Sequence, residues 1–171
     1  MMKLFLVTIC ILFLVWGQLF LVQEHVYAAT TNQVPQTVIN PGSFLYPVKR
    51  AAEKILYFIQ FSQTAKFNYQ KDLLQTRLAE LSDVAQNKSL GQIETSSQRF
   101  AYQAGILSDF IVSNQLKKEG NVLLSLFSKD AAILAKLRDL YPANSSYWLL
   151  LQQDIDTLML NSEKIRNLTK N

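Results

Sequence analysis

Apolar side chains recur at steps of three and four residues along most of the chain after residue 46, and this spacing constrains the fold more than any other feature of the sequence. Such a repeat places the apolar side chains on one face of an α-helix, which buries that face against its neighbours. The alternation typical of β-strands persists nowhere, and the gaps between the repeats are short. We therefore expect an all-α fold, an antiparallel bundle of four to five helices.

Capping residues and helix breakers place the ends of these helices. Pro47 suits a first turn because its missing N–H costs little there, and Gly120-Asn121 is expected to end the third helix. Pro142 prevents continuation of the fourth helix. The first expected helix spans 47–61, and the second runs from a cap at Ser62 or Thr64 to about 87. The third spans 93–118 and the fourth spans 122–140. The fifth runs from a cap at 144–146 to beyond 165.

We expect each helix to turn its apolar face toward a shared core. In the first helix this face comprises Val48, Ala51, Ala52, Ile55, Phe58 and Ile59. In the second it comprises Phe67, Leu74, Leu78, Leu81 and Ala85, with Lys71, Arg77 and Glu80 on the flanks. The later faces comprise Phe100, Ala104, Leu107 and Ile111, then Leu123, Leu126, Phe127, Leu134 and Leu137, then Trp148, Leu151, Ile155, Leu158 and Ile165. Gly105, within the third helix, is expected to mark a close helix crossing.

The first 28 residues have the layout of a signal peptide. Lys3 supplies a positive start, residues 4–22 form an almost uncharged apolar run, and Val26-Tyr27-Ala28 is a sequence that signal peptidase accepts. The run is also about long enough to cross a bilayer. Residues 1–28 are therefore expected to be either a cleaved signal peptide or an uncleaved membrane anchor.

Both outcomes predict that the rest of the chain is extracytoplasmic, secreted or anchored to the outer face of the cytoplasmic membrane. Residues 29–43 are polar, contain two prolines and lack helical periodicity, which favours a flexible tether. The helical domain is then expected to occupy residues 44–171. Cys10 lacks the small-residue context of a lipidated cysteine, so no lipid anchor is expected.

The only cysteine, Cys10, and the only histidine, His25, both precede the expected domain. A domain without them has no thiol nucleophile, disulfide, imidazole base or Cys/His zinc site. Asp154 and Asp156 lie two residues apart and cannot share a helix face, so we expect two solvated acids instead of a catalytic pair. No catalytic residue, metal site or cofactor is expected.

The charge distribution indicates which classes of partner to expect. The formal net charge of +4 is unchanged when residues 1–28 are set aside, because Lys3 and Glu24 cancel. A positive excess of this size favours anionic lipid, cell-wall polymer or nucleic acid only where the bases cluster, and here they are interspersed with acids. We expect a mixed surface, no nucleic-acid partner, and an envelope protein, glycan or lipid as the partner.

A short motif opens the expected domain: Leu45, Tyr46, Pro47, Lys49, Arg50 and Glu53. Tyr46 is held extended by the proline that follows, and Pro47 then starts the helix, which would orient Leu45 and Tyr46 against a neighbour. Lys49 and Glu53 are expected to form an exposed i,i+4 pair. The alternative is a partner-binding role, since an exposed Arg beside a Tyr is typical of binding hot spots.

At Leu45-Tyr46-Pro47-Val48-Lys49-Arg50, followed by Glu53, the chain resembles a bacterial family, the domain of unknown function 5667, in which Leu-Tyr-Pro-Leu-Lys-Arg-x-x-Glu opens a helical domain behind a signal peptide or membrane span. The second helix is also similar, although Gln75-Thr76 departs from the family pattern. The resemblance covers most of residues 40–171. It implies an exported helical domain with no established catalytic activity, and it carries over no active site.

Aromatic side chains gather around the first turn between helices: Tyr57, Phe58, Phe61, Phe67 and Tyr69. They are expected to be core, with a ligand cleft as the alternative. For the whole chain we expect a non-enzymatic interaction or structural module of the cell envelope. A membrane-anchored sensory or regulatory ectodomain is the alternative, and an acid-only hydrolase would need carboxylates that converge in a cleft.

Overall fold

The computed structural model describes residues 43–170, and all structural statements below concern this part of the chain. It contains the helices α2 (Tyr46–Phe58), α3 (Gln63–Gln86), α4 (Leu90–Ser113), α5 (Lys117–Arg138) and α6 (Ser146–Lys170). Residues 43–170 contain no strand. The expected all-α fold is confirmed, and these residues form five helices where four to five were expected. The expected signal segment and nearly all of the expected tether lie outside the described residues.

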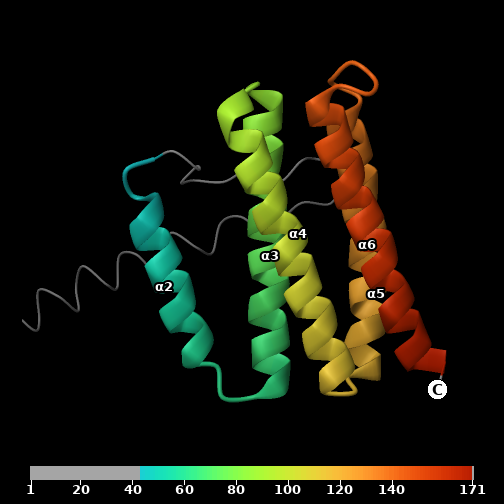
Figure 1. Ribbon diagram of the computed structural model, residues 1–171. Helices are drawn as coiled ribbons and strands as arrows, with labels where there is room; N and C mark the ends of the chain where they lie inside the picture. The colour runs from blue at the N-terminus through green and yellow to red at the C-terminus, as the bar shows by residue number, and fades with distance from the viewer. Residues whose placement is uncertain (1–42, 171) are drawn as a thin grey trace, which may run out of the picture. The chain divides into compact units, whose positions relative to one another are not determined.

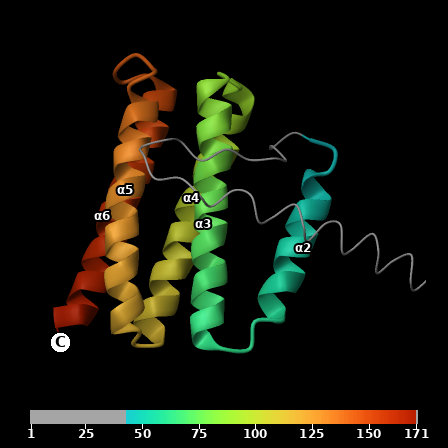
Figure 2. The ribbon, with the colours of Figure 1, turned by 180° about the vertical axis from the view of Figure 1, so that it is seen from behind.

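The four long helices α3 to α6 pack as an antiparallel bundle (Figures 1 and 2). The main interfaces join α3 to α4, α4 to α6, and α5 to α6. The apolar faces expected for these four helices supply the core, which includes Phe67, Leu74, Leu78, Phe100, Leu107, Ile111, Leu123, Phe127, Leu134, Leu151, Ile155 and Ile165. Trp148, expected in this set, is only half-buried.

Each loop within the bundle turns through one non-glycine residue with positive φ: Lys88 at 53°, Gln115 at 55° and Asn144 at 62°. Gln115 follows the end of α4, where its N–H bonds Val112 O at 3.3 Å and the next N–H, of Leu116, bonds Ile111 O at 3.1 Å. This pair of bonds is a Schellman motif, which usually contains glycine at the left-handed position.

The third helix was expected to run to residue 118 and end at Gly120-Asn121, and this expectation is wrong. The motif at Gln115 ends α4 at Ser113, and α5 begins at Lys117. Gly120 therefore lies within α5, close to α6. A Cβ on Gly120 would lie 3.0 Å from Ile165 Cγ2, whereas a Cβ on Gly105 would have no atom within 4 Å. The close approach expected at Gly105 is at Gly120 instead.

Helix α2 lies beside α3, on the side of the bundle away from α5 and α6 (Figures 1 and 2). Within residues 43–170 its contact with α3 is far less extensive than the three main interfaces of the bundle. It contributes no side chain to the hydrophobic core cluster of the described residues. The attachment of α2 therefore needs another explanation than apolar packing.

Candidate functional site

Helix α2 faces the bundle with its polar side. Tyr46 is 7% exposed, and Lys49, Arg50 and Glu53 are partly buried. The face that was expected to be buried is exposed throughout: Val48, Ala51, Ala52, Ile55, Phe58 and Ile59. That expectation is wrong, because α3 presents buried charged groups to α2, and buried charges require hydrogen-bonding partners that only the polar face supplies.

The charged groups on α3 are Arg77 and Glu80, each 1% exposed. They were expected on the flanks of the second helix, and this is also wrong. Residues 77–82 are all buried, so this turn of α3 is covered on every side. With Tyr46, Lys49, Glu53 and Arg99 they form a connected set, here called the polar clamp.

Glu80 is the centre of the polar clamp. Its Oε1 accepts hydrogen bonds from Lys49 Nζ at 2.7 Å and from Arg77 Nη1 at 2.6 Å, and its Oε2 accepts from the Tyr46 hydroxyl at 2.9 Å. Burial alone would raise the pKa of Glu80, but the charges of Arg77 and Lys49 hold that pKa below its ordinary value. Glu80 is therefore an anion enclosed by donors from two helices.

Arg77 connects both acids of the polar clamp. It bonds Glu80 through Nη1 and the Glu53 carboxylate through Nη2. Burial opposes its charge, yet the carboxylates of Glu80 and Glu53 raise the pKa of Arg77. Lys49 and Glu53 were expected to pair with each other. Each pairs instead with a residue of α3, and Glu53 also accepts from Arg50 Nη1 at 3.2 Å.

Tyr46 joins a third helix to the polar clamp. Its hydroxyl accepts a hydrogen bond from Arg99 Nη1 of α4 at 2.9 Å, and the Arg99 guanidinium lies 4.8 Å from the centre of the Tyr46 ring. Burial, followed by the charge of Glu80, raises the pKa of Tyr46 to about 12. The hydroxyl therefore keeps its proton at ordinary pH and remains a donor to Glu80.

The start of α2 positions Tyr46. Pro47 lies in the first turn of α2, and the Tyr46 N–H bonds Ser43 O at 3.0 Å. Leu45 was expected to turn inward with Tyr46, but it is 52% exposed. The structure thus brings Tyr46, Lys49, Arg50 and Glu53 of the opening motif together on the bundle side and leaves Leu45 outside.

The aromatic side chains near the first turn divide into two groups. Phe67 is buried, and Tyr57 and Tyr69 are half-buried with ring centres 6.3 Å apart. The Tyr69 hydroxyl donates to Glu53 O at 2.6 Å, which adds a second contact between α3 and α2. Phe58 and Phe61 are 80% and 94% exposed, so the core expected for all five is wrong for these two.

Two more acids are buried in the bundle. Asp130 accepts from Gln75 Nε2 at 2.9 Å, and burial raises its pKa to about 7. Asp154 was expected to be solvated but is 1% exposed, and burial raises its pKa to about 8 despite a hydrogen bond from Ser97. Asp156 is exposed, so it does not share the buried side of α6 with Asp154. Asp130 and Asp154 contact different helices and form no carboxylate pair.

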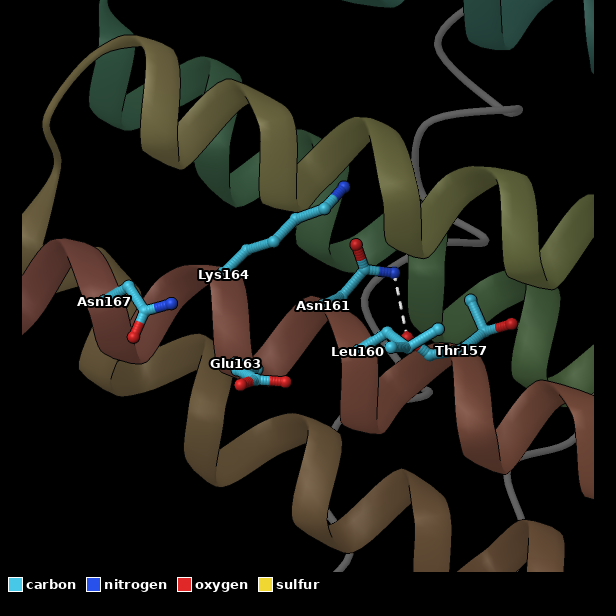
Figure 3. Close-up of a pocket in the computed structure, with 6 residues that line it drawn as sticks. All are labelled: Thr157, Leu160, Asn161, Glu163, Lys164 and Asn167. Carbon is cyan, nitrogen blue, oxygen red and sulfur yellow. Dashed lines mark hydrogen bonds between the residues drawn. The ribbon is translucent and has the colours of Figure 1, made fainter.

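A shallow hollow runs along α6, lined by Thr157, Leu160, Asn161, Glu163, Lys164 and Asn167 (Figure 3). Asn161 donates to Thr157 O at 3.0 Å within the helix. Lys164 and Glu163 extend to opposite sides of α6 in this view, and Lys164 Nζ lies 3.4 Å from Asp109 Oδ1. This single-helix lining brings no set of functional groups together.

Residues 43–170 contain no cluster of three or more potential metal-ligating side chains. None of the described helices combines the length and the apolar character that crossing a bilayer requires. The apolar run at 4–22 lies outside the described residues.

A family model described as a domain of unknown function (DUF5667) matches residues 38–130. The chain belongs to this family. The match confirms the family inferred from the opening motif, and it includes every residue of the polar clamp of this DUF5667 chain. No curated protein and no solved structure matches the DUF5667 chain.

Sequence reasoning on this DUF5667 chain identified the α2 half of the polar clamp and missed Arg77, Glu80 and Arg99. A signal was present, since Arg77 and Glu80 are opposite charges three residues apart beside the buried Leu78 and Leu81. Arg99 offered no comparable signal, because its partner Tyr46 lies 53 residues away in the chain.

Proposed function

We propose that this chain is an exported, non-enzymatic module of the bacterial cell envelope, and that α2 is its interaction element. One observation carries the proposal: the polar face of α2 is held by the polar clamp while its apolar face is exposed. An exposed, contiguous apolar surface is typical of an interaction site.

The exposed apolar side chains concentrate near α2. In the described part, seven of fourteen exposed large apolar residues lie within residues 44–61: Phe44, Leu45, Val48, Ile55, Phe58, Ile59 and Phe61. Single apolar residues scattered over a surface are common and need no explanation. A cluster of exposed apolar side chains does, because full burial of each one is favourable by roughly 1.5–3 kcal/mol of free energy. A partner that covers this face therefore has a substantial driving force.

The polar clamp explains why α2 does not roll over to bury its apolar face. Rolling would remove the α2 partners of Arg77 and Glu80 and leave these two only their contact with each other. Breaking a buried ion pair by removing one side costs about 3–5 kcal/mol. Hydrogen bonds from Lys49 and Tyr46 also have defined directions, which fixes one orientation of α2. These features support a role in presenting α2 to a partner.

Support for a non-enzymatic role comes from the chemistry of the side chains. The acids and bases of the polar clamp satisfy one another, and Tyr46 remains protonated. The buried carboxylates Asp130 and Asp154 interact with neutral groups on separate helices. Acid-only hydrolysis would require two carboxylates converging on one substrate position.

Export can be tested with a membrane-impermeant maleimide on intact cells. The variant chain carries Cys10→Ser and Met159→Cys, because Met159 is 60% exposed on α6. We expect labelling of intact cells equal to that of lysed cells. Labelling that requires lysis would place the domain in the cytoplasm and contradict the proposal.

The interaction role can be tested by placing a photo-crosslinking amino acid at Ile55, which is 57% exposed, in the same cells. Met159 is the matched control, since its exposure is similar and it lies on a helix that does not contact α2. We expect an adduct with an envelope component at position 55 only. Equal or absent adducts at both positions would contradict the role of α2.

A membrane-anchored sensory or regulatory ectodomain remains the second proposal. Its support is the apolar run at 4–22, which is about long enough to span a bilayer if it is retained. The mass of the mature N-terminus distinguishes the two. A chain that begins at Ala29 has no transmembrane connection and contradicts the ectodomain proposal.

A further inference from the structure

We propose that the partner of α2 is an anionic lipid surface, on which α2 lies with its apolar face inserted among the headgroups. This inference rests on the proposed function and specifies its partner. The face concerned, here called the α2 apolar face, comprises Val48, Ala51, Ala52, Ile55, Phe58 and Ile59. The difference in hydropathy between this face and the opposite side of α2 is larger than the difference between the two sides of any other described helix.

Basic side chains follow one edge of the α2 apolar face. At 100° per residue, Lys54 lies at this edge and Arg50 lies next to it, toward the bundle side. Interfacial helices have this arrangement, because the aliphatic stems of Lys and Arg follow the apolar surface while their charges reach the phosphates. Lys54 is exposed, and the Arg50 side chain is 37% exposed while it contacts Glu53.

No acid lies on the outward side of α2. Glu53 is the only acidic residue of the helix, and it faces the bundle, where it binds Arg77. A surface that combines apolar side chains with bases and lacks acids is complementary to anionic phospholipid. A second copy of the chain fits less well, because two such faces would bring Arg50 and Lys54 of both copies together without acids between them.

Exposed aromatic side chains flank α2 at both ends. Phe44 precedes the helix and is 93% exposed, and Phe61 follows it and is 94% exposed. Aromatic and aliphatic side chains of this kind bury into the boundary between headgroups and acyl chains. In the proposed orientation both side chains would add apolar contact without adding charge.

One feature of the chain favours a lipid partner over a protein partner, and another lowers the cost of binding to either. The apolar run at 4–22 is separated from Phe44 by the 21 residues 23–43, so a retained run brings α2 to a membrane within the reach of that segment. The polar clamp also holds α2 helical before it meets the surface. A preformed helix pays no folding cost on binding, which most interfacial peptides must pay.

The test uses the full chain with Cys10→Ser and an environment-sensitive fluorophore on Ile55→Cys, reconstituted in vesicles of phosphatidylcholine with or without phosphatidylglycerol. We expect a blue shift and a several-fold rise in emission when phosphatidylglycerol is present. The same fluorophore on Met159→Cys, at similar exposure on α6, should not respond. Lys54→Gln should weaken the response to phosphatidylglycerol by about fivefold.

Four results would overturn the proposal. The first is an unchanged spectrum at position 55 in both vesicle types, and the second is an equal response at position 159. The third is a response equally large without phosphatidylglycerol. The fourth is a blue shift that depends on protein concentration in the absence of vesicles, which would identify a second copy as the occupant.

These outcomes separate the lipid partner from the broader proposed function. A protein adduct at position 55 in intact cells, together with an unresponsive fluorophore in vesicles, would exclude the lipid surface and leave α2 as an interaction element. Absence of both an adduct and a vesicle response would contradict both proposals.

Discussion

Glu80 accepts hydrogen bonds from three side chains while its own side chain is 1% exposed. Two of these donors, Tyr46 and Lys49, belong to α2, so the charge of Glu80 is the main electrostatic link between α2 and α3. Because α2 adds no side chain to the core cluster of the described residues, the apolar packing that could replace this link is limited to contacts such as that of Tyr57 with Tyr69.

We predict that Glu80→Gln releases α2 without unfolding the bundle. The amide carries no negative charge for Lys49, so the docked state loses its ion pair from Glu80 to α2 while Arg77 keeps Glu53. Loss of a buried ion pair costs about 3 kcal/mol, on the order of a hundredfold in the docking equilibrium. Hydrogen exchange should accelerate for the amides of α2, while amides of α4 and α6 keep their protection. Glu163→Gln, at an exposed acid, is the control, and equal protection of α2 in both variants would refute the prediction.

Asp154 provides a residue-scale prediction on pH. Burial raises its pKa to about 8, so the folded protein holds a proton that the unfolded chain releases above its ordinary value of 3.8. Stability is therefore highest at low pH and falls as pH rises toward 8, by about 1.4 kcal/mol per pH unit for this group. Asp130 acts with the same sign up to about 7. Glu80 acts with the opposite sign, but only below its ordinary value of 4.5.

We predict that Asp154→Asn reduces this slope between pH 5 and 8 and makes the variant more stable than the natural chain at pH 9. Urea denaturation midpoints measured across this range would detect the change. Asp156→Asn, at an exposed position two residues away, should leave the slope unchanged. Parallel curves for the natural chain and Asp154→Asn would show that Asp154 is ionised in the folded protein.

At the scale of elements, the three- and four-residue spacing predicted all five helices and the buried faces of α3 to α6, because their partners are other apolar faces. The same spacing located the apolar face of α2 but could not tell which way it points. That direction depends on Arg77 and Glu80, which lie on another helix and are 24 or more residues away from their α2 partners. Periodicity within one helix carries no information on such pairs.

Helix ends were predicted less well where the sequence lacks the usual residue. The end of α4 depends on Gln115 at φ 55°, a position where glycine is common, so the glycine at 120 was the more conventional signal. Gly120 is needed for another reason, the contact of α5 with Ile165. The glycine at position 120 therefore marks the close packing of α5 on α6 and not the end of a helix.

We predict that Gln115→Gly stabilises the protein by about 1 kcal/mol, because glycine adopts positive φ without the strain that a Cβ causes. Thermal or urea denaturation would measure the gain. Gln115→Ala is the control, since alanine keeps the Cβ and should give no gain. A loss of stability on Gln115→Gly would mean that the Gln115 side chain contributes more than its backbone strain costs.

Substitutions of Gly105 in α4 and Gly120 in α5 should change the stability of the protein in opposite directions. Gly105→Ala gains helix propensity worth about 0.5–1 kcal/mol and meets no atom within 4 Å. Gly120→Leu forces a larger side chain against Ile165, Ile111 and Thr169, and overpacking of this kind costs about 1–3 kcal/mol. Denaturation of both variants tests the pair, and a stabilising Gly120→Leu would contradict the close approach of α5 and α6.

At the scale of the whole described molecule, two kinds of interaction have separate roles. The bundle α3 to α6 is held by a shared apolar core, and α2 is attached to it through charges and hydrogen bonds. Apolar packing would have buried the face that α2 now exposes. The polar attachment therefore leaves that face available for the envelope partner that we propose.

The central claim is that α2 turns its polar face inward and its apolar face outward, and a single-cysteine scan of residues 46–60 tests it most directly. A chain beginning at Ala29 contains no cysteine, so every introduced thiol reports on its own position. With a water-soluble thiol reagent and no lipid, we predict fast reaction at positions 48, 51, 52, 55, 58 and 59. Reaction should be slow at positions 56 and 57, which are half-buried and lie outside the polar clamp, so their substitution leaves the clamp intact. The reverse pattern, with the apolar face protected and positions 56 and 57 reactive, would contradict the account.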